Sequence, residues 1–194
     1  MEKLKFLKEN FTDKICNSKY ELYDHIFQTY GIDGDMFEFG VYEGTTINYI
    51  SSLYKDKIIY GFDSFEGLPE KWRNGFEKGA FNLNGNFPNV NNNVKLFKGW
   101  FNESLPIFLK ENDIKKIGFI HIDCDIYSST KDIFTILDKF ITKNTVIVFD
   151  EYYNYPGWED HEYKAFQEYI IASGKKYKYI CYNASHEQVA VIIL

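Results

Sequence analysis

The chain has 194 residues, a net charge of −6 at pH 7 and 45% hydrophobic residues, which is typical of one domain with a sizeable core. Its acidic balance excludes a general nucleic-acid surface, because such a surface needs a basic patch to displace counterions from phosphates. No apolar run approaches the length of a membrane span, so we expect neither a membrane nor a nucleic acid as a partner.

Predicted elements alternate between helix and strand along the chain. Residues 1–34 come first as a helical N-terminal extension, in which Leu22, Ile26 and Phe27 have helical spacing. Apolar runs of strand length then alternate with stretches of helical periodicity, which indicates β-then-α units with right-handed crossovers. Strands are expected at 36–41, 58–63, 94–98, 117–123 and 145–150, and helices at 45–55, 103–112, 128–141 and 161–173.

The longest stretch without periodicity is residues 64–93, which contains four glycines. A loop of about 30 residues inside a compact domain is usually either a functional lid or a disordered segment. We favour the lid, because the aromatic side chains of Trp72, Phe76, Phe81 and Phe87 could fold down over a ligand.

The chain closes on two strand-like runs, residues 177–182 and 188–194, with no room for a helix between them. We therefore expect an antiparallel hairpin that turns near Asn183 and Ala184. Together with the preceding units, this hairpin predicts an α/β layered sheet in a single domain, residues 1–194.

Three cysteines, Cys16, Cys124 and Cys181, are an odd number without disulfide-type or metal-type spacing. Cys124 and Cys181 lie in strand-like contexts, where a free cysteine behaves as a small buried hydrophobe. The N-terminus has no apolar core of the signal-peptide type. These features predict a reducing, cytoplasmic location.

Four of the apolar runs end on acidic residues, namely Glu38, Asp63, Asp123 and the pair Asp150-Glu151. In parallel sheets, ligands bind in the crevice at the carboxyl ends of the strands. If the runs are neighbouring parallel strands, their acids gather at one edge of the sheet. That edge is the candidate active site.

The first two acids lie in turns that suit a nucleoside cofactor. Gly40 and Gly44, after Glu38, permit a β–α turn in which the backbone passes close to a ligand. The turn is not G-x-G-x-x-G, which argues against a pyrophosphate grip. Asp63 is placed to accept hydrogen bonds from ribose hydroxyls. A tight structural turn and a turn-initiating aspartate are the competing explanations.

Other candidates are ambiguous on the residues alone. The stretch Gly99-Trp100-Phe101 could bracket an adenine by stacking, and core packing explains it equally well. His161, at the start of a predicted helix, is the better candidate for a catalytic base, although a solvated histidine is the simpler interpretation. His121 is expected to be buried within a strand.

The remaining acids have the pattern of a cation site. Asp123 and Asp125 are two residues apart and point to the same side of an extended chain, and Asp150 with Glu151 ends the next strand. Buried like charges at one sheet edge repel, and a cation resolves the repulsion. Oxygen-only ligands select Mg²⁺, Ca²⁺ or Mn²⁺ over Zn²⁺. Alternatively, Asp125 only precedes a helix and Asp150 only ends a strand.

Five stretches follow one another in this order: Glu38-Phe39-Gly40 with Gly44, GFDSFEGLP at 61–69, Lys98-Gly99-Trp100-Phe101 to Leu105-Pro106, HIDCDIYSST at 121–130 and Asp150-Glu151-Tyr152. Together they resemble the macrocin O-methyltransferase family, within the class I S-adenosylmethionine-dependent methyltransferases. The resemblance covers roughly residues 35–170. Its specific strings are Phe-Asp-Ser-Phe-Glu-Gly-Leu-Pro and Asp-x-Asp-x-Tyr-x-Ser-Thr.

The resemblance implies a Rossmann-like, seven-stranded, mostly parallel sheet with helices on both faces and an antiparallel C-terminal strand. It also implies S-adenosylmethionine across the first strand ends, and Mg²⁺ or another hard divalent cation beside the methyl group. Carried over by position, the cofactor-binding residues are Glu38, Gly40, Tyr42, Gly44, Thr45, Asp63, Ser64, Gly99, Trp100 and Asp123.

The same resemblance implies Asp123, Asp150 and Glu151 as metal ligands, with Asp125 close by, and we expect His161 and Asp123 to be the catalytic residues. The expected activity is Mg²⁺-dependent O-methylation of a hydroxyl on a sugar-containing small molecule or glycan precursor. A homodimer is one of the oligomeric states that the sequence allows. One alternative is a nucleotide-dependent oxidoreductase, which the absent G-x-G-x-x-G disfavours. Another is a catalytically inactive ligand-binding module, which has no need of clustered carboxylates.

Overall fold

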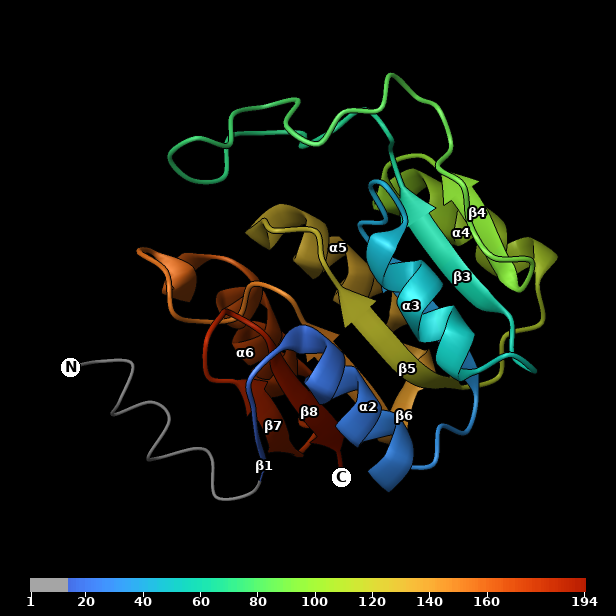
Figure 1. Ribbon diagram of the computed structural model, residues 1–194, viewed down its shortest axis with the longest axis vertical. Helices are drawn as coiled ribbons and strands as arrows, with labels where there is room; N and C mark the ends of the chain where they lie inside the picture. Colours follow the sequence, from blue (N-terminus) through green and yellow to red (C-terminus); the bar gives the residue numbers. More distant parts are fainter. Residues whose placement is uncertain (1–13) are drawn as a thin grey trace.

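The computed structural model describes residues 14–194, so the first 13 residues of the expected N-terminal extension lie outside the described residues. One eight-stranded sheet, in the order β1-β7-β8-β6-β5-β2-β3-β4, forms the centre of the fold (Figure 1). Its strands are β1 (Lys14–Cys16), β2 (Asp35–Phe39), β3 (Ile59–Asp63), β4 (Val94–Lys98), β5 (Ile117–Ile122), β6 (Ile141–Phe149), β7 (Tyr177–Asn183) and β8 (Val189–Ile193).

All neighbouring strands pair in parallel except β8, which runs antiparallel to both β6 and β7. Strands β5 and β8 are buried along their whole length, as expected of apolar strands covered on both faces. The predicted α/β fold with an antiparallel C-terminal strand is confirmed. The predicted terminal hairpin is β7 and β8.

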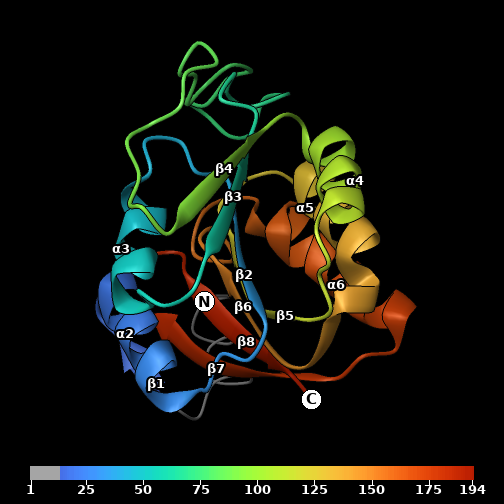
Figure 2. The same ribbon diagram turned by 90° about the vertical axis from the view of Figure 1, so that its right-hand side faces the viewer.

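Helices cover both faces of the sheet (Figure 2). On one face lie α2 (Lys19–Thr29) and α3 (Thr45–Leu53), which bury Leu22, Ile26 and Ile47 in one hydrophobic cluster. On the other face lie α4 (Phe101–Glu111), α5 (Tyr127–Leu137) and α6 (Glu162–Ser173), whose apolar side chains form a second cluster. Two short 3₁₀ helices, η1 (Asp138–Phe140) and η2 (Trp158–Asp160), complete the elements. None of the described helices is long and apolar enough to cross a bilayer.

Most boundaries lie within two residues of the sequence-based expectation, and two regions differ by more. The part of the N-terminal extension from Lys14 contains the expected helix, but it begins with the short strand β1, which adds an eighth strand by pairing with β7. The helix expected at 128–141 ends at Leu137, and Ile141 instead begins β6. Ile141 is apolar and fully buried. A buried apolar residue is equally compatible with the end of a helix and with the start of a strand, so the sequence pattern did not distinguish them.

Residues 64–93 form an irregular segment that we call the cover segment, because it crosses the carboxyl edge of the sheet (Figure 1). Its internal order comes from backbone hydrogen bonds, including Leu68 N to Ala80 O at 2.9 Å and Trp72 N to Phe76 O at 3.0 Å. An isolated bridge joins Glu66 to Asn82. A compact loop closed by its own contacts is typical of functional surface loops.

Candidate active site

A cavity of about 490 Å³ lies at the carboxyl edge of the sheet, between the strand ends and the cover segment. Of the residues predicted to contact a cofactor, those that line it are Gly40, Tyr42, Thr45, Asp63, Ser64, Gly99, Trp100 and Asp123. Glu38 and Gly44 are not in its wall. Glu38 is almost fully buried within β2, and Gly44 is the residue that precedes α3. Ligands of α/β proteins bind at this edge.

Asp63, at the end of β3, holds the β2–α3 turn in place. Its Oδ2 accepts hydrogen bonds from the backbone N–H groups of Val41 and Tyr42, both at 2.8 Å, and its Oδ1 accepts one from Phe65 N at 2.7 Å. Tyr42 has a φ of 46°, a strained conformation for a residue with a side chain. Asp63 therefore fixes a strained turn, and its carboxylate also faces the cavity.

Gly40 is required by a close approach within the protein. It has a φ of 89°, and a Cβ atom built on it would lie 1.6 Å from the carbonyl oxygen of Asp123. The sequence suggested that this glycine lets the backbone pass close to a ligand. In the structure it lets the β2–α3 turn pass against the end of β5, and so places the predicted cofactor turn directly beside Asp123.

Asp123 is shared by two groups of possible cation ligands. In one group, ligand atoms of His121, Asp123 and Asp150 all lie within 4.8 Å of one another, and in the other those of Asp123, Asp125 and Glu151 do. The residues predicted as metal ligands are therefore divided between the two groups: Asp123 with Asp150 in the first, and Asp123 with Glu151, beside Asp125, in the second. They come from the ends of β5 and β6, which are neighbouring parallel strands.

The buried acids fit a cation in their chemistry. Asp150 Oδ1, Glu151 Oε2 and Glu38 Oε1 are buried and have no hydrogen-bond partner among the described residues. Burial, followed by the charge of Asp150, raises the pKa values of both Asp123 and Glu151 well above their usual range. Buried carboxylate oxygens without partners are costly, and a hard divalent cation would supply what these oxygens lack.

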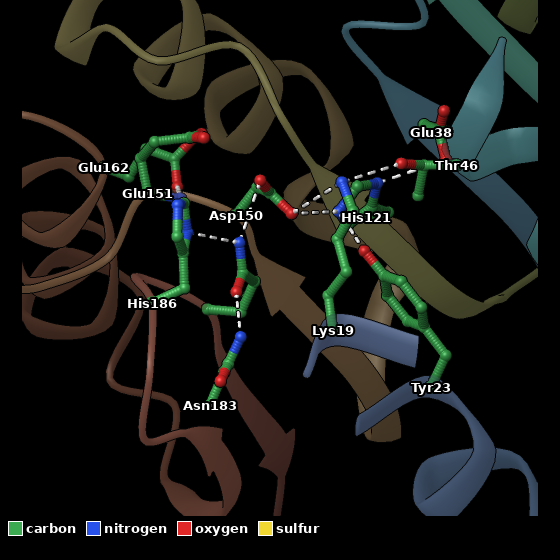
Figure 3. A network of polar contacts seen from close by, with 11 residues as sticks. Lys19, Tyr23, Glu38, Thr46, His121, Asp150, Glu151, Glu162, Asn183 and His186 are labelled. Atoms are coloured by element: carbon green, nitrogen blue, oxygen red, sulfur yellow. Dashed lines mark hydrogen bonds and ion pairs between the residues drawn. The ribbon is translucent and has the colours of Figure 1, made fainter. Parts of the chain in front are cut away.

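His121 is buried in the network below the cavity (Figure 3). Its Nδ1 lies 3.1 Å from Glu38 Oε2, and its Nε2 lies 2.9 Å from the hydroxyl of Tyr23 and 3.6 Å from Asp150 Oδ1. Burial disfavours charge on the ring, but the carboxylates of Asp150 and Glu38 outweigh it and raise the pKa of His121 to about 10. His121 is therefore a buried strand residue, as expected, and it acts as a counter-ion to the acids.

Asp125 lines the cavity in a strained backbone conformation, with a φ of 67°. Burial and the charge of Asp150 raise the pKa of its carboxyl group to about 7. Non-glycine residues in this conformation cluster at functional sites. Asp125 precedes α5 and also belongs to the acid cluster. The sequence offered these as alternatives, a residue before a helix or an acid of a cation site, and the position of Asp125 is compatible with both.

His161 does not line the cavity. Its ring lies against Trp72 and Tyr155, with ring centroids 6.5 Å and 6.3 Å apart. Burial lowers the pKa of its imidazole. The structure thus places this predicted base behind the aromatic side chain of Trp72.

Sequence reasoning missed three charged residues at the site. Lys19, at the start of α2, and Arg73, in the cover segment, line the cavity. Glu162 is fully buried behind Glu151, whose backbone N–H donates to Glu162 Oε2 at 3.2 Å. No motif marks them, because each comes from a polar stretch that only the tertiary fold brings to the sheet edge.

The cover segment packs over the cavity through aromatic side chains. Trp72, Phe76 and Phe81 line the cavity, and the Tyr42 ring contacts that of Phe81 at a centroid distance of 5.4 Å. Phe87, also predicted to fold over a ligand, is 58% exposed and is not in the cavity wall. Its ring packs on that of Phe65, near the start of the cover segment, at a centroid distance of 5.1 Å.

Comparisons with known proteins give one family model and several similar proteins. A family model described as a methyltransferase domain matches residues 37–152, which is more than half of the chain. Demethyldecarbamoylnovobiocin O-methyltransferase of Streptomyces niveus is 25% identical over 159 residues, which cover 69% of this chain and 59% of that protein. The chain thus spans less than two thirds of the length of this curated relative.

Solved structures share the fold. The calicheamicin methyltransferase CalS11 matches with a TM-score of 0.70 and 22% identity, over 88% of this chain and 75% of that one. The mycinamycin-pathway methyltransferase MycE, solved in complex with Mg and SAH, matches with a TM-score of 0.57 and 13% identity, over 89% of this chain and 48% of that one. With the matched family model extending from β2 through the turn after β6, the chain belongs to the methyltransferase domain family.

Proposed function

We propose that the protein is an S-adenosylmethionine-dependent O-methyltransferase that uses a divalent cation and acts on a hydroxyl group of a sugar-containing small molecule or glycan precursor. The observation that carries the proposal is the cavity, whose wall joins the strained β2–α3 turn to buried carboxylates that each keep one oxygen without a hydrogen bond from the described residues. The family, and the relative that methylates an oxygen, support the same reaction.

The cofactor end of the cavity would be formed by the predicted residues of the first strand ends. Asp63 would accept from the ribose hydroxyls, and it remains able to do so because a carboxylate has about four acceptor sites and three are used. Trp100 and Gly99 would lie beside the adenine. S-adenosylmethionine supplies an electrophilic methyl group, so the protein has to bind the cofactor and orient an acceptor.

Asp123, Asp150 and Glu151 would hold the cation. The fit rests on Asp150 Oδ1 and Glu151 Oε2, two buried oxygens that accept no hydrogen bond from the described residues, and on Asp123 as the residue common to both ligand groups. Asp150 Oδ1 has only the longer ion pairs to His121 and Lys19. Gln188 Nε2 donates to Asp150 Oδ2 at 3.1 Å and so orients that carboxylate. A hard cation at such a site lowers the pKa of a hydroxyl group that it binds and fixes the position of its oxygen.

Asp125 is better placed than His161 to remove the proton from the hydroxyl group of the acceptor substrate. Its carboxylate lines the cavity within 4.8 Å of a ligand atom of Asp123, whereas the ring of His161 lies behind Trp72. A general base has to reach the proton that it removes, directly or through one water molecule. We therefore assign the proton transfer to Asp125, with Asp123 beside it.

The acceptor would bind between the cover segment and the start of α5. Trp72 and Phe76 offer apolar faces on one side, and Ser128, Ser129 and Asp132 offer hydrogen-bonding groups on the other. Such a combination suits a polyhydroxylated ring. The relatives named for novobiocin and calicheamicin support an acceptor of the sugar-containing natural-product class.

Isothermal titration and a methyl-transfer assay test the proposal. We expect the full chain to bind S-adenosylhomocysteine, to bind Mn²⁺ or Mg²⁺, and to transfer radiolabelled methyl groups to members of a glycoside panel with Mg²⁺ but not with EDTA. Asp150→Asn should abolish cation binding. Asp132→Asn, which lines the same cavity outside the two ligand groups, should retain it. A wild-type protein that does not bind S-adenosylhomocysteine overturns the proposal.

A further inference from the structure

Lys19, the first residue of α2, is part of the cavity wall. Its side chain points toward Asp150 (Figure 3). Its side chain is 30% exposed, and its Nζ lies 3.3 Å from Thr46 Oγ1 and 3.9 Å from Asp150 Oδ1. One helical turn later, the hydroxyl of Tyr23 contacts His121. The N-terminal part of the described chain therefore supplies polar groups to the site and does more than cover the sheet.

The ammonium group of Lys19 has hydrogen-bond donors available for a ligand. An ammonium group has three donors, and Thr46 takes one of them. The distance of 3.9 Å to Asp150 allows attraction but is too long for a hydrogen bond. A ligand that reaches this point can therefore take the remaining donors.

An anionic group of a ligand would find its donors at Lys19 and not at Arg73. Of the described residues in the cavity wall, two carry a positive charge, Lys19 and Arg73. Arg73 is engaged, because its Nη1 lies 3.0 and 3.1 Å from the two carboxylate oxygens of Glu187. Lys19 instead faces the start of α3, where Gly44 offers no side-chain cap, so the N–H groups of the first helical turn lack helical partners. Thr46 belongs to this first turn, and its Oγ1 lies 3.3 Å from the Lys19 Nζ, so the two sets of donors are close to each other.

The proposed cofactor carries one anionic group, the carboxylate of its amino-acid end. We propose that Lys19 binds this carboxylate together with Thr46, and so acts as a specificity residue that selects adenosine thioethers bearing an amino-acid end. The inference rests on the proposed function. It adds a contact from α2, an element that lies outside the matched family region and outside every motif of the sequence.

Two ligands that differ only in the carboxylate test the role of Lys19. S-adenosylhomocysteine and S-adenosyl-3-thiopropylamine, the same molecule without the carboxylate, are titrated calorimetrically into the full chain in the presence of EDTA. Chelation keeps any effect of the variant on cation binding out of the measurement. We expect wild type to prefer S-adenosylhomocysteine by about 10- to 100-fold, the range of a hydrogen bond between charged groups. Lys19→Met should lose most of that preference, by weaker binding of S-adenosylhomocysteine.

Matched variants separate this contact from a general loss of charge or of folding. Lys14→Met removes the same charge five residues upstream, where Lys14 pairs with Glu21 on the surface, and should keep the wild-type preference. Lys19→Arg should restore part of it. Circular dichroism and thermal melts check that each variant folds. If Lys19→Met does not fold, the titrations are carried out with Lys19→Gln.

The outcomes distinguish the two proposals. If wild type binds neither ligand, the proposed function fails and the role of Lys19 fails with it. If wild type binds both equally, or a folded Lys19 variant other than Lys19→Arg keeps the full preference, the role of Lys19 is wrong while the proposed function stands.

Discussion

Single residues set how closely the predicted cofactor turn and the acid cluster approach each other. Gly40 matters most, since any side chain there meets the backbone carbonyl of Asp123. The approach of the two backbones continues a ladder in which Asp123 N donates to Phe39 O at 2.8 Å. A glycine that sequence reasoning assigns to ligand access thus has an architectural reason of its own.

Gly40→Ala is predicted to be much more destabilising than a matched glycine substitution. Gly157 has a similar φ, 83° against 89°, but its Cβ would meet nothing within 4 Å. Gly157→Ala should therefore lower the free energy of unfolding by about 1–2 kcal/mol, the conformational cost alone. Gly40→Ala adds the steric clash and should lower it by about 3 kcal/mol or more. Urea titrations of both variants measure the difference, and equal losses would contradict the role of the close approach.

The residues of the site were predictable from sequence where they end strands. Asp63, Asp123 and Asp150 follow apolar runs, so their gathering at one edge needs only the rule for parallel sheets. Lys19 was not predictable, because its partners Thr46 and Asp150 lie 27 and 131 residues away in sequence. His161 was a candidate by residue type and helix position, and only the packing of Trp72 shows where its ring lies.

At the scale of elements, the short and irregular pieces escaped prediction while the long periodic ones did not. Strand β1 has three residues, and its pairing with β7 is a contact across most of the chain, for which local sequence holds no signal. The cover segment was predictable as a loop, because its sequence is a long stretch without helical or strand periodicity. Its anchoring was not, since that depends on Arg73 reaching Glu187 in the turn between β7 and β8.

Arg73 is predicted to be the main anchor of the cover segment. Its guanidinium contacts Glu187, and its Cζ lies 3.8 Å from the ring centroid of Trp72 and 4.5 Å from that of Tyr155. Hydrogen bonds between charged groups of this kind contribute about 1.5–3 kcal/mol, so Arg73→Ala should raise the local opening of the segment about tenfold or more. Hydrogen exchange of the Trp72 amide, which donates to Phe76 O, measures this opening.

Lys71→Ala serves as the control for that variant. Lys71 pairs with Glu77 at 2.6 Å within the same segment, but the two side chains are 55% and 66% exposed. Exposed pairs contribute little, so exchange at Trp72 should stay within about twofold of wild type. Equal exchange in wild type and Arg73→Ala would show that the segment is held by its aromatic contacts alone.

For the molecule as a whole, the site is an excess of buried acidic residues over basic ones at the carboxyl edge of the sheet. Glu38, Asp125, Asp150, Glu151 and Glu162 are all less than 9% exposed, and Asp123 lies among them. Among the described residues, the cations near these acids are His121, Lys19 and Arg73, the last of which pairs with Glu187. Buried acids in excess lower stability, and natural proteins retain such costs at sites where function requires them. The fold without a cation is therefore less stable than its core alone would allow.

Removing one acid is predicted to stabilise the cation-free protein and to abolish its response to cations. In EDTA, Asp123→Asn should raise the melting temperature, because it removes the cost of burying this carboxylate and its repulsion from Asp150 and Asp125. With Mg²⁺ or Mn²⁺ at 100 times its dissociation constant, wild type should gain about 2.7 kcal/mol, or roughly 5–10 °C, while Asp123→Asn gains nothing. Asp113→Asn, an 81% exposed control with the same charge change, should leave the response of wild type intact. A melting temperature of Asp123→Asn below that of wild type in EDTA would mean that hydrogen bonding by this carboxylate, and not its repulsion, dominates the edge of the sheet.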